Sequence, residues 1–334
     1  MTTPKQEPTP GPLLERSAAY WEACTLHAGV RLDVFSVISG GALAADEVAR
    51  RVGGDVRGVT TLLDALAAMG LLEKDGDAYR NTETAALFLD RASPRYVGHI
   101  IRHHHYLVES WSRLPEAVLG GRPVRDRDHR TPEQRESFLM GMFNLAMGIA
   151  PRLCREIDIA GRRRLLDLGG GPGTYAIHFC LANPELHAVV FDLPTTEPFA
   201  RRTIERFGVA DRVTFRAGDF LRDDLGGPYD VAWISHVLHS EGPAGCRRLL
   251  RKVASALEPG GLVLVHEFIL DDHRAGPLFP ALFSLNMLLG TPEGRSYTET
   301  ELVDMLAEAG AADIRRLPFA GPNQSGIVAG RLPG

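Results

Sequence analysis

A glycine-rich turn is the first candidate for chemistry in this sequence. Residues 167–174 read DLGGGPGT, between an apolar run and the helix-like segment 176–182. Glycine allows positive φ or lets a ligand lie directly on the backbone, and the following helix start has free N–H groups. The pattern predicts a strand, a turn and a helix that cradle a nucleotide. Thr174 stands where the dinucleotide fingerprint needs its third glycine, and no G-x-x-x-x-G-K-[ST] motif occurs.

Three aspartates accompany β-like runs. Asp167 closes the first run, Asp192 follows residues 187–191, and Asp219 comes two residues after the run at 213–217. The carboxyl ends of neighbouring parallel strands meet at one crevice, where an acid about 20 residues past the glycines can reach the ribose hydroxyls. A single aspartate more often caps a helix or begins a turn. Three at three strand ends favour a binding site.

A histidine and a glutamate belong to the same predicted edge. His239 follows the run 229–235, and Glu267 lies in the apolar run 262–270. A charged group in an apolar strand needs a partner, so we expect Glu267 to orient the imidazole of His239, while His266 points to the opposite face. With an unperturbed pKa of about 6.5, imidazole is mostly neutral at cellular pH and can take the proton of a phenolic hydroxyl.

The motifs DLGGGPGT, FDLP, GDF, VLH and EPGGLVLVHE together resemble the S-adenosylmethionine-dependent methyltransferases of the plant caffeate and hydroxyindole O-methyltransferase type, including bacterial natural-product members. The resemblance covers most of the chain and implies S-adenosylmethionine as cofactor and His239 as general base. It implies the glycines at the amino-acid portion, Asp192 at the ribose, and Asp219 with Phe220 at the adenine. The predicted cofactor-binding residues are Asp167, Gly169, Gly170, Gly171, Asp192, Leu193, Gly218, Asp219, Phe220 and Ser235.

Two positions depart from the family pattern. The base is typically followed by Asp-Trp, whereas Ser240 and Glu241 follow His239, and a second glutamate that brackets the base corresponds to about Ser296. A less polarised histidine, a more acidic acceptor or different chemistry would each fit these changes. C-methylation, or a non-methylating reaction on the same scaffold, therefore stays an alternative to O-methylation.

Two apolar helices are candidates for the acceptor pocket. Methyl transfer from a sulfonium is an in-line displacement, which requires alignment, exclusion of water and removal of the acceptor's proton. Apolar and adaptable side chains suit a flat aromatic acceptor, although core packing is the alternative role for the same residues. The predicted substrate-binding residues are Met140, Phe143, Asn144, Met147, Phe283, Asn286 and Met287.

The N-terminal part predicts a helical domain. Residues 1–12 carry four prolines and are expected to be a disordered tail. Helical patterns at 43–53 and 56–70, followed by a hairpin pattern at 71–80, predict a winged helix. DNA binding by a regulator is the alternative function of such a module. Arg57 is the only base near the start of the would-be recognition helix, so packing and dimerisation are favoured.

Composition limits the remaining possibilities. The 334 residues are 44% hydrophobic and 24% charged with a net charge of −5, which suits more than one globular domain and does not favour a nucleic-acid partner. No stretch approaches the roughly 20 apolar residues of a membrane span, and the start lacks a signal-peptide core, so we expect a cytoplasmic protein without a membrane partner. Scattered cysteines and the consecutive histidines 103–105 lack metal-binding spacing, and we expect no metal.

These observations define the expected architecture. We predict an α/β class I methyltransferase with a Rossmann-like doubly wound sheet at residues 156–334. An N-terminal all-α winged-helix dimerisation domain is expected at 13–155. The helical pattern at 13–38 is apolar on too many sides for one buried stripe, which favours a homodimer. The expected partners are a small-molecule acceptor and a second copy of the chain.

Overall fold

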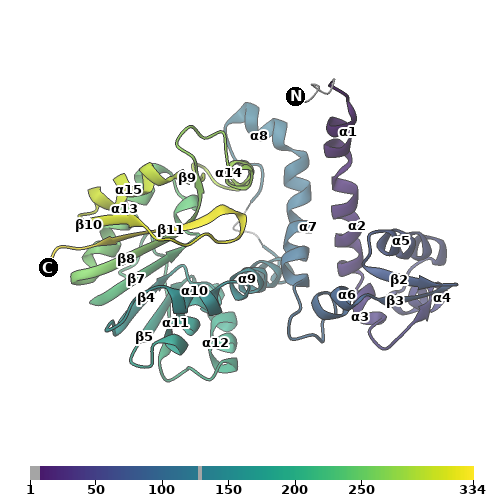
Figure 1. The fold of residues 1–334 in the computed structure, drawn as a ribbon, viewed down its shortest axis with the longest axis horizontal. Coiled ribbons are helices and arrows are strands. Elements are labelled where there is room, and N and C mark those ends of the chain that lie inside the picture. Colours follow the sequence, from purple (N-terminus) through teal and green to yellow (C-terminus); the bar gives the residue numbers. More distant parts are fainter. Residues whose placement is uncertain (1–7, 127–129) are drawn as a thin grey trace, which may run out of the picture. The chain divides into compact units, whose positions relative to one another are not determined.

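The computed structural model describes residues 8–126 and 130–334 (Figure 1). By its contacts the chain forms two compact units, Met1–Tyr106 and Leu107–Gly334, here called the N-terminal unit and the C-terminal unit. One large buried cluster of apolar side chains lies in the N-terminal unit, and two lie in the C-terminal unit. Each unit therefore has a core of its own.

The N-terminal unit contains a winged helix. Its elements are α1 (Gly11–Ala18), α2 (Tyr20–Arg31), α3 (Val34–Val37), β1 (Leu43–Ala44), α4 (Ala45–Val52), α5 (Val56–Ala68), β2 (Leu72–Asp75), β3 (Ala78–Asn81) and α6 (Glu83–Phe88), and α7 (Gly98–Ser112) crosses into the next unit. β1, β3 and β2 form an antiparallel sheet in that order. Val48, Leu63 and Tyr79 share one core. The winged-helix prediction is confirmed, and β1 adds a third short strand to the predicted hairpin of β2 and β3.

The tail predicted at residues 1–12 lies mostly outside the described residues. Within them, α1 begins at Gly11, so the last two residues of the predicted tail are helical, and the tail itself stays a prediction. Pro12 occupies the first turn of this helix, where a missing N–H removes no helical hydrogen bond and the fixed φ favours the helix.

The C-terminal unit alternates strands and helices. It contains α8 (Leu114–Gly120), α9 (Pro132–Met147), α10 (Ala150–Glu156), β4 (Arg164–Leu168), α11 (Thr174–Ala182), β5 (His187–Asp192), η1 (Pro194–Thr196), α12 (Glu197–Arg206), β6 (Val213–Ala217), β7 (Tyr229–Ser235), η2 (Leu238–Ser240), α13 (Pro243–Ser255), β8 (Leu257–Leu270), α14 (Leu278–Gly290), β9 (Tyr297–Thr298), α15 (Glu299–Glu308), β10 (Ala312–Arg316), η3 (Pro322–Gln324) and β11 (Ser325–Arg331).

One mixed sheet organises this unit. Its strand order is β10-β11-β8-β7-β4-β5-β6, and short β9 pairs with β8. The strands from β8 to β6 run parallel, whereas β11 is antiparallel to both β8 and β10. The carboxyl ends of β4, β5, β6, β7 and β8 therefore meet at one edge, which is where ligands bind in open α/β sheets.

Helices cover both faces of the sheet, as Figure 1 shows. Leu165 of β4 belongs to a core with α10, α11 and α12, whereas the next residue, Leu166, belongs to a core with α13 and α15. Successive strand residues point to opposite faces, and both faces of this central strand are buried. The predicted doubly wound α/β fold is confirmed.

Contacts divide the chain earlier than the predicted domain boundary. The helices α9 and α10 contact α11, and α8 contacts α14, so all three belong to the C-terminal unit. The boundary near residue 155 stays a prediction about domain roles, because contacts alone do not say which helices act in dimerisation.

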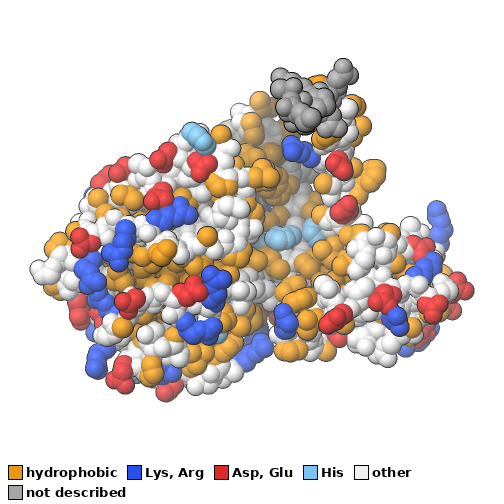
Figure 2. Space-filling model, in the orientation of Figure 1, with side chains coloured by type: hydrophobic (Ala, Val, Ile, Leu, Met, Phe, Trp, Pro, Cys, Tyr) orange, Lys and Arg blue, Asp and Glu red, His pale blue; other side chains and the backbone are white. Residues whose placement is uncertain are grey.

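Surface and helix composition add two observations. Acidic and basic side chains are interspersed over the C-terminal unit on the face shown in Figure 2. In the described part of the chain no single helix has the length and apolar composition of a membrane span, and only the bent pair α9 and α10, taken together, meets that test.

Candidate active site

The glycine turn lies between β4 and α11, as predicted. Gly169, Gly171 and Gly173 have φ of 63°, 55° and 78°, which is costly for other residues. A Cβ on Gly170 would lie 2.6 Å from Cγ of Asp167, whereas a Cβ on Gly171 would meet nothing within 4 Å. The turn therefore presents bare backbone beside open space, an arrangement that suits a ligand lying against it.

Asp192 connects this turn to the neighbouring strand. Its Oδ2 accepts the N–H of Gly171 at 2.8 Å, and its Oδ1 accepts the N–H of Leu193 at 2.6 Å and the hydroxyl of Thr196 at 3.0 Å. Burial raises the pKa of Asp192, and these hydrogen bonds oppose the rise. The predicted ribose-binding carboxylate and the glycine turn thus lie side by side.

Asp167 lies beneath the turn and is 1% exposed. Its Oδ2 accepts the N–H of Ala176 at 3.2 Å, while its Oδ1 has no hydrogen-bond partner among the described residues. Burial raises the pKa of Asp167 to about 7; the bond from Ala176 opposes this rise and the charge of Asp192 adds to it. A cationic group nearby would favour the ionised form and offset the cost of burying it. An amino-acid ligand carries such a group in its ammonium.

The end of β6 supplies the third part of this edge. The N–H of Gly218 donates to the carbonyl of Asp192 at 2.9 Å, and a Cβ on Gly218 would lie 2.4 Å from the ring of Phe191. Asp219 and Phe220 follow directly. The three strand ends that the sequence analysis placed around one crevice are therefore adjacent in the sheet.

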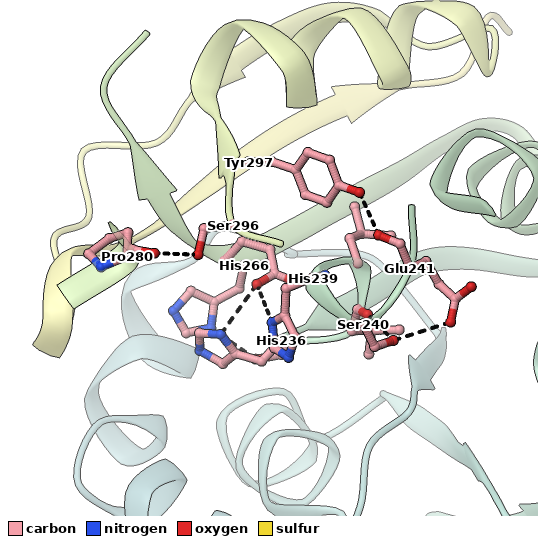
Figure 3. A network of polar contacts seen from close by, with 12 residues as sticks. His236, His239, Ser240, Glu241, His266, Pro280, Ser296 and Tyr297 are labelled. Carbon is pink, nitrogen blue, oxygen red and sulfur yellow. Dashed lines mark hydrogen bonds and ion pairs between the residues drawn. The ribbon is translucent and has the colours of Figure 1, made fainter. Parts of the chain in front are cut away.

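His239 and Glu267 are hydrogen-bonded to each other. Nδ1 of His239 lies 2.8 Å from Oε2 of Glu267, and the backbone N–H of His239 donates to Oε1 at 3.3 Å (Figure 3). Burial alone would raise the pKa of Glu267, but the positive charge and hydrogen bonds that His239 and His236 offer outweigh burial and hold it well below its usual range. Glu267 is therefore an ionised carboxylate that is 1% exposed.

This pairing fixes the tautomer of His239. An ionised carboxylate only accepts hydrogen bonds, so in the neutral form of His239 the proton is on Nδ1 and the lone pair is on Nε2. Nε2 makes no hydrogen bond to any described residue, and the ring of Phe283 lies edge-on to the imidazole with centroids 4.8 Å apart. The imidazole thus has one nitrogen held and one nitrogen open, as a general base requires.

A second imidazole, His236, approaches the same carboxylate, and the sequence analysis missed it. Nδ1 of His236 lies 3.6 Å from Oε2 of Glu267, and its ring packs on Phe268 with centroids 4.2 Å apart. Its φ of 56° is unusual for a residue with a side chain. The H-x-x-H spacing of His236 and His239 beyond the end of β7 was the available signal.

Ser235 and His266 form a pair behind this cluster. The hydroxyl of Ser235 lies 2.9 Å from Nδ1 of His266, which is fully buried and whose ring lies 5.5 Å from that of Trp233. Burial, followed by the charge of His236, lowers the pKa of His266 well below its usual range, so it is neutral. The cofactor-binding role of Ser235 stays a prediction.

The two serines that depart from the family pattern bond elsewhere. The hydroxyl of Ser240 donates to the carbonyl of Val237, and that of Ser296 donates to the carbonyl of Pro280, each at 2.8 Å. Neither hydroxyl contacts His239 in the described structure. Within that part of the chain, the imidazole of His239 hydrogen-bonds to a single carboxylate, Glu267.

The turn that carries His239 has other anchors. The hydroxyl of Tyr297 donates to the carbonyl of Glu241 (Figure 3). The thiol of Cys246 donates to the carbonyl of Leu238 at 3.2 Å. Both anchors are buried, and the sequence analysis identified neither of them as part of the site. Their contacts are with main-chain carbonyls, which no residue pattern specifies.

Aromatic side chains gather beside His239. The ring of Phe268 lies 4.8 Å from that of Phe283 and 4.9 Å from that of Phe279. The predicted pocket residue Asn286 accepts a hydrogen bond from Arg125 at 3.2 Å, and Met287 is 3% exposed. Phe283 thus lies beside His239 and Met287 is buried, and the acceptor-binding roles of Phe283, Asn286 and Met287 stay predictions.

Two of the predicted pocket residues of α9 contact other helices. Phe143 lies against Phe207 with ring centroids 6.4 Å apart, and the sulfur of Met147 lies 3.4 Å from Nε2 of His178. These partners belong to α11 and the end of α12 rather than to the His239 cluster. The acceptor-binding roles of Met140, Phe143, Asn144 and Met147 stay predictions.

Comparison with known protein families yields two matches. Residues 116–312 match the O-methyltransferase domain, and residues 14–91 match the O-methyltransferase dimerisation domain.

Similar proteins cover nearly the whole chain. The 3-hydroxy-5-methyl-1-naphthoate 3-O-methyltransferase of Streptomyces sahachiroi is 36% identical over an alignment of 335 positions that covers 98% of this chain and 97% of that protein. The tetracenomycin polyketide synthesis 8-O-methyl transferase TcmO of Streptomyces glaucescens is 37% identical over an alignment of 332 positions that covers 97% of each chain. Human N-acetylserotonin methyltransferase in complex with S-adenosylmethionine superimposes with a TM-score of 0.88 at 26% identity, covering 100% of both chains.

Cofactor binding should release protons from Asp167. At a pKa of about 7 this carboxyl is about half protonated at pH 7. The cationic cofactor would lower that pKa, so S-adenosylmethionine should release up to about half a proton at pH 7. Titration calorimetry in buffers of different ionisation enthalpy measures this release. It should vanish in Asp167→Asn and persist in Asp211→Asn, whose side chain is 75% exposed. Equal release from both variants would contradict the assignment.

Proposed function

This chain belongs to the S-adenosylmethionine-dependent O-methyltransferase family, and we propose that it methylates a hydroxyl of a small aromatic, polyketide-like acceptor with His239 as general base. The observation that carries the proposal is the buried hydrogen bond between Nδ1 of His239 and ionised Glu267 at 2.8 Å, which leaves Nε2 free to accept a proton.

The cofactor supplies a methyl group already activated on a sulfonium. We assign its amino-acid portion to Gly169, Gly170 and Gly171 above Asp167, its ribose to Asp192, and its adenine to Asp219 with Phe220. The positive-φ backbone of the turn and the unpartnered Oδ1 of Asp167 fit a cationic amino-acid group. Leu193, Gly218 and Ser235 complete the proposed site.

His239 then handles the acceptor's proton. Its Nε2 takes the hydroxyl proton while the new carbon–oxygen bond forms and the carbon–sulfur bond breaks. The resulting imidazolium is stabilised by Glu267, because the opposite charges lie in a buried site where their attraction is strong. Glu267 acts through His239 and is a positioning residue.

An aromatic acceptor is favoured by the rings beside the base. Phe268, Phe279 and Phe283 offer edges and faces suited to a flat ring system. Two similar proteins are named for a hydroxynaphthoate and for tetracenomycin polyketide synthesis. We therefore propose a fused-ring phenol as the acceptor class. Membership of the O-methyltransferase family favours an enzyme over the DNA-binding alternative. The cytoplasmic location and the lack of nucleic-acid or membrane partners stay predictions.

Removing the base should abolish most of the activity. A general base contributes about 100- to 10,000-fold, so His239→Ala should lower kcat by that factor while cofactor affinity is retained. Glu267→Gln should lower kcat by at least about tenfold, because the amide holds the imidazole without a charge. Transfer of labelled methyl groups to phenols and hydroxynaphthoates, with product masses, measures both effects.

The exposed His187 offers a matched control for these variants. His187→Ala should keep the parent rate. Full turnover by His239→Ala would instead support C-methylation or a non-methylating reaction on this scaffold.

We also propose that the chain forms a homodimer through its N-terminal helices. The dimerisation-domain match covers residues 14–91, and α1 has no buried residue within the single chain. Tyr20 and Trp21 at the start of α2 are 62% and 64% exposed, which is a large apolar surface to leave in water.

Charge on this surface should separate the two copies. Light scattering of the parent at micromolar concentration should give the mass of a dimer, and Tyr20→Glu combined with Trp21→Glu should give that of a monomer, because association would bury the new charges unpaired. Leu181→Glu, at an exposed apolar position on α11, is the control and should stay dimeric. A monomeric parent would contradict the proposal.

A further inference from the structure

Glu267 faces a histidine that the methyl-transfer proposal does not use. Nδ1 of His236 lies 3.6 Å from Oε2 of Glu267, and the same oxygen bonds Nδ1 of His239 at 2.8 Å. The three donor atoms lie within 4.8 Å of one another. Two imidazole nitrogens and one carboxylate oxygen are the protein ligands of a recurring class of zinc sites.

The fold holds His236 toward this carboxylate. Its backbone N–H donates to the carbonyl of His266 at 2.8 Å, and its ring lies between those of His266 and Phe268, with centroids 4.5 and 4.2 Å away. The left-handed φ of 56° costs energy, and such strain clusters at functional sites. Nδ1 of His236 is buried, and its separation of 3.6 Å from Oε2 of Glu267 is an ion-pair distance that is longer than a normal hydrogen bond. A ligand at this atom would supply the close bond that the carboxylate does not make with it.

The spacing suits a metal ion without rebuilding the site. Ligand bonds of about 2.0–2.2 Å in a tetrahedron place donor atoms roughly 3.3–3.5 Å apart. The separations of 2.8 and 3.6 Å from Oε2 lie on either side of that value, and all three donor atoms lie within 4.8 Å of one another. Side-chain rotations that bring the two imidazole nitrogens closer together would therefore admit an ion. His236 provides access, since its side chain is 26% exposed and that of His239 is 11% exposed.

We propose that His236, His239 and Glu267 form a binding site for Zn²⁺ or a similar divalent transition-metal ion, and that the ion inhibits methyl transfer. A metal on Nδ1 of His239 displaces the proton held there. A neutral imidazole then carries its proton on Nε2, the nitrogen that must accept the acceptor's proton. Binding depends only on the three ligands, whereas inhibition rests on the proposed role of His239.

The donor set also predicts selectivity. Imidazole suits Zn²⁺, Co²⁺ and Ni²⁺, while Mg²⁺ prefers oxygen ligands and retains its water. Mg²⁺ at the same concentration should therefore neither bind nor inhibit. The proposal departs from the prediction that the chain binds no metal, which considered the cysteines and the histidines 103–105 but not the fold around Glu267.

Equilibrium dialysis of the full-length protein against ZnCl₂ tests the binding. The parent should bind one zinc ion per chain. His236→Asn should lower the zinc affinity by at least about 100-fold, because it removes a direct ligand and the loss of an outer-shell partner alone costs 10- to 100-fold. The exposed His187 provides the control His187→Asn, which should keep the site. Equal zinc affinity in the parent and in His236→Asn would overturn the proposal. Calorimetry with S-adenosylmethionine checks that each variant folds.

X-ray absorption of the zinc-loaded parent gives a test that needs no variant. Two imidazole ligands with one or two oxygen ligands are expected, and a spectrum with fewer than two imidazoles would overturn the site. To measure inhibition, the rate of methyl transfer with zinc is divided by the rate of the same variant without zinc. Zinc bound at the site without inhibition would overturn the inhibitory part of the proposal. Full turnover by His239→Ala would overturn the proposed base and leave the metal site standing, so the two failures are distinguishable.

Discussion

The burial of one ionised carboxylate, Glu267, constrains the rest of this site. A charge in the middle of an apolar strand is tolerated only when partners compensate for its lost hydration. His239 supplies that compensation with its backbone N–H and its ring, and this fixes both the tautomer and the direction of the imidazole. The turn η2 must therefore lie near the carboxyl-terminal part of β8, and the parallel pairing of β7 with β8 brings it there.

The same edge of the parallel sheet brings the predicted cofactor-binding residues close to His239. β4, β5 and β6 end in the glycine turn, Asp192 and Gly218, while β7 ends next to η2. A parallel sheet brings these ends to one side whatever their separation in the sequence. Asp167 and Glu267 are both buried carboxylates at this edge, yet their partners differ. Asp167 has an oxygen that bonds none of the described residues, which suits a cationic ligand, whereas Glu267 is paired with histidines.

Much of this arrangement followed from the sequence because it is encoded in local patterns. Glycines at 169–173 require positive φ, and an acidic residue inside an apolar run predicts a buried partner, so the turn and the contact between Glu267 and His239 could be foreseen. His236 could not, because its approach to Glu267 depends on a left-handed backbone at a residue with a side chain. The packing of Phe143 against Phe207 was equally hidden, since helical spacing does not tell which neighbour a buried ring meets.

Ser240 and Ser296, which replace residues of the family pattern, bear on how the turn of His239 is held more than on which reaction takes place. Each hydroxyl bonds a main-chain carbonyl away from the imidazole, and the turn carrying His239 is held by Tyr297 and Cys246 through carbonyls of its own backbone. Fixing the main chain of a turn requires no acidic side chain, so His239 keeps its position without the acids expected beside it. In the proposed reaction, the charge that stabilises an imidazolium would come from Glu267, whose burial in the sheet makes that single interaction strong.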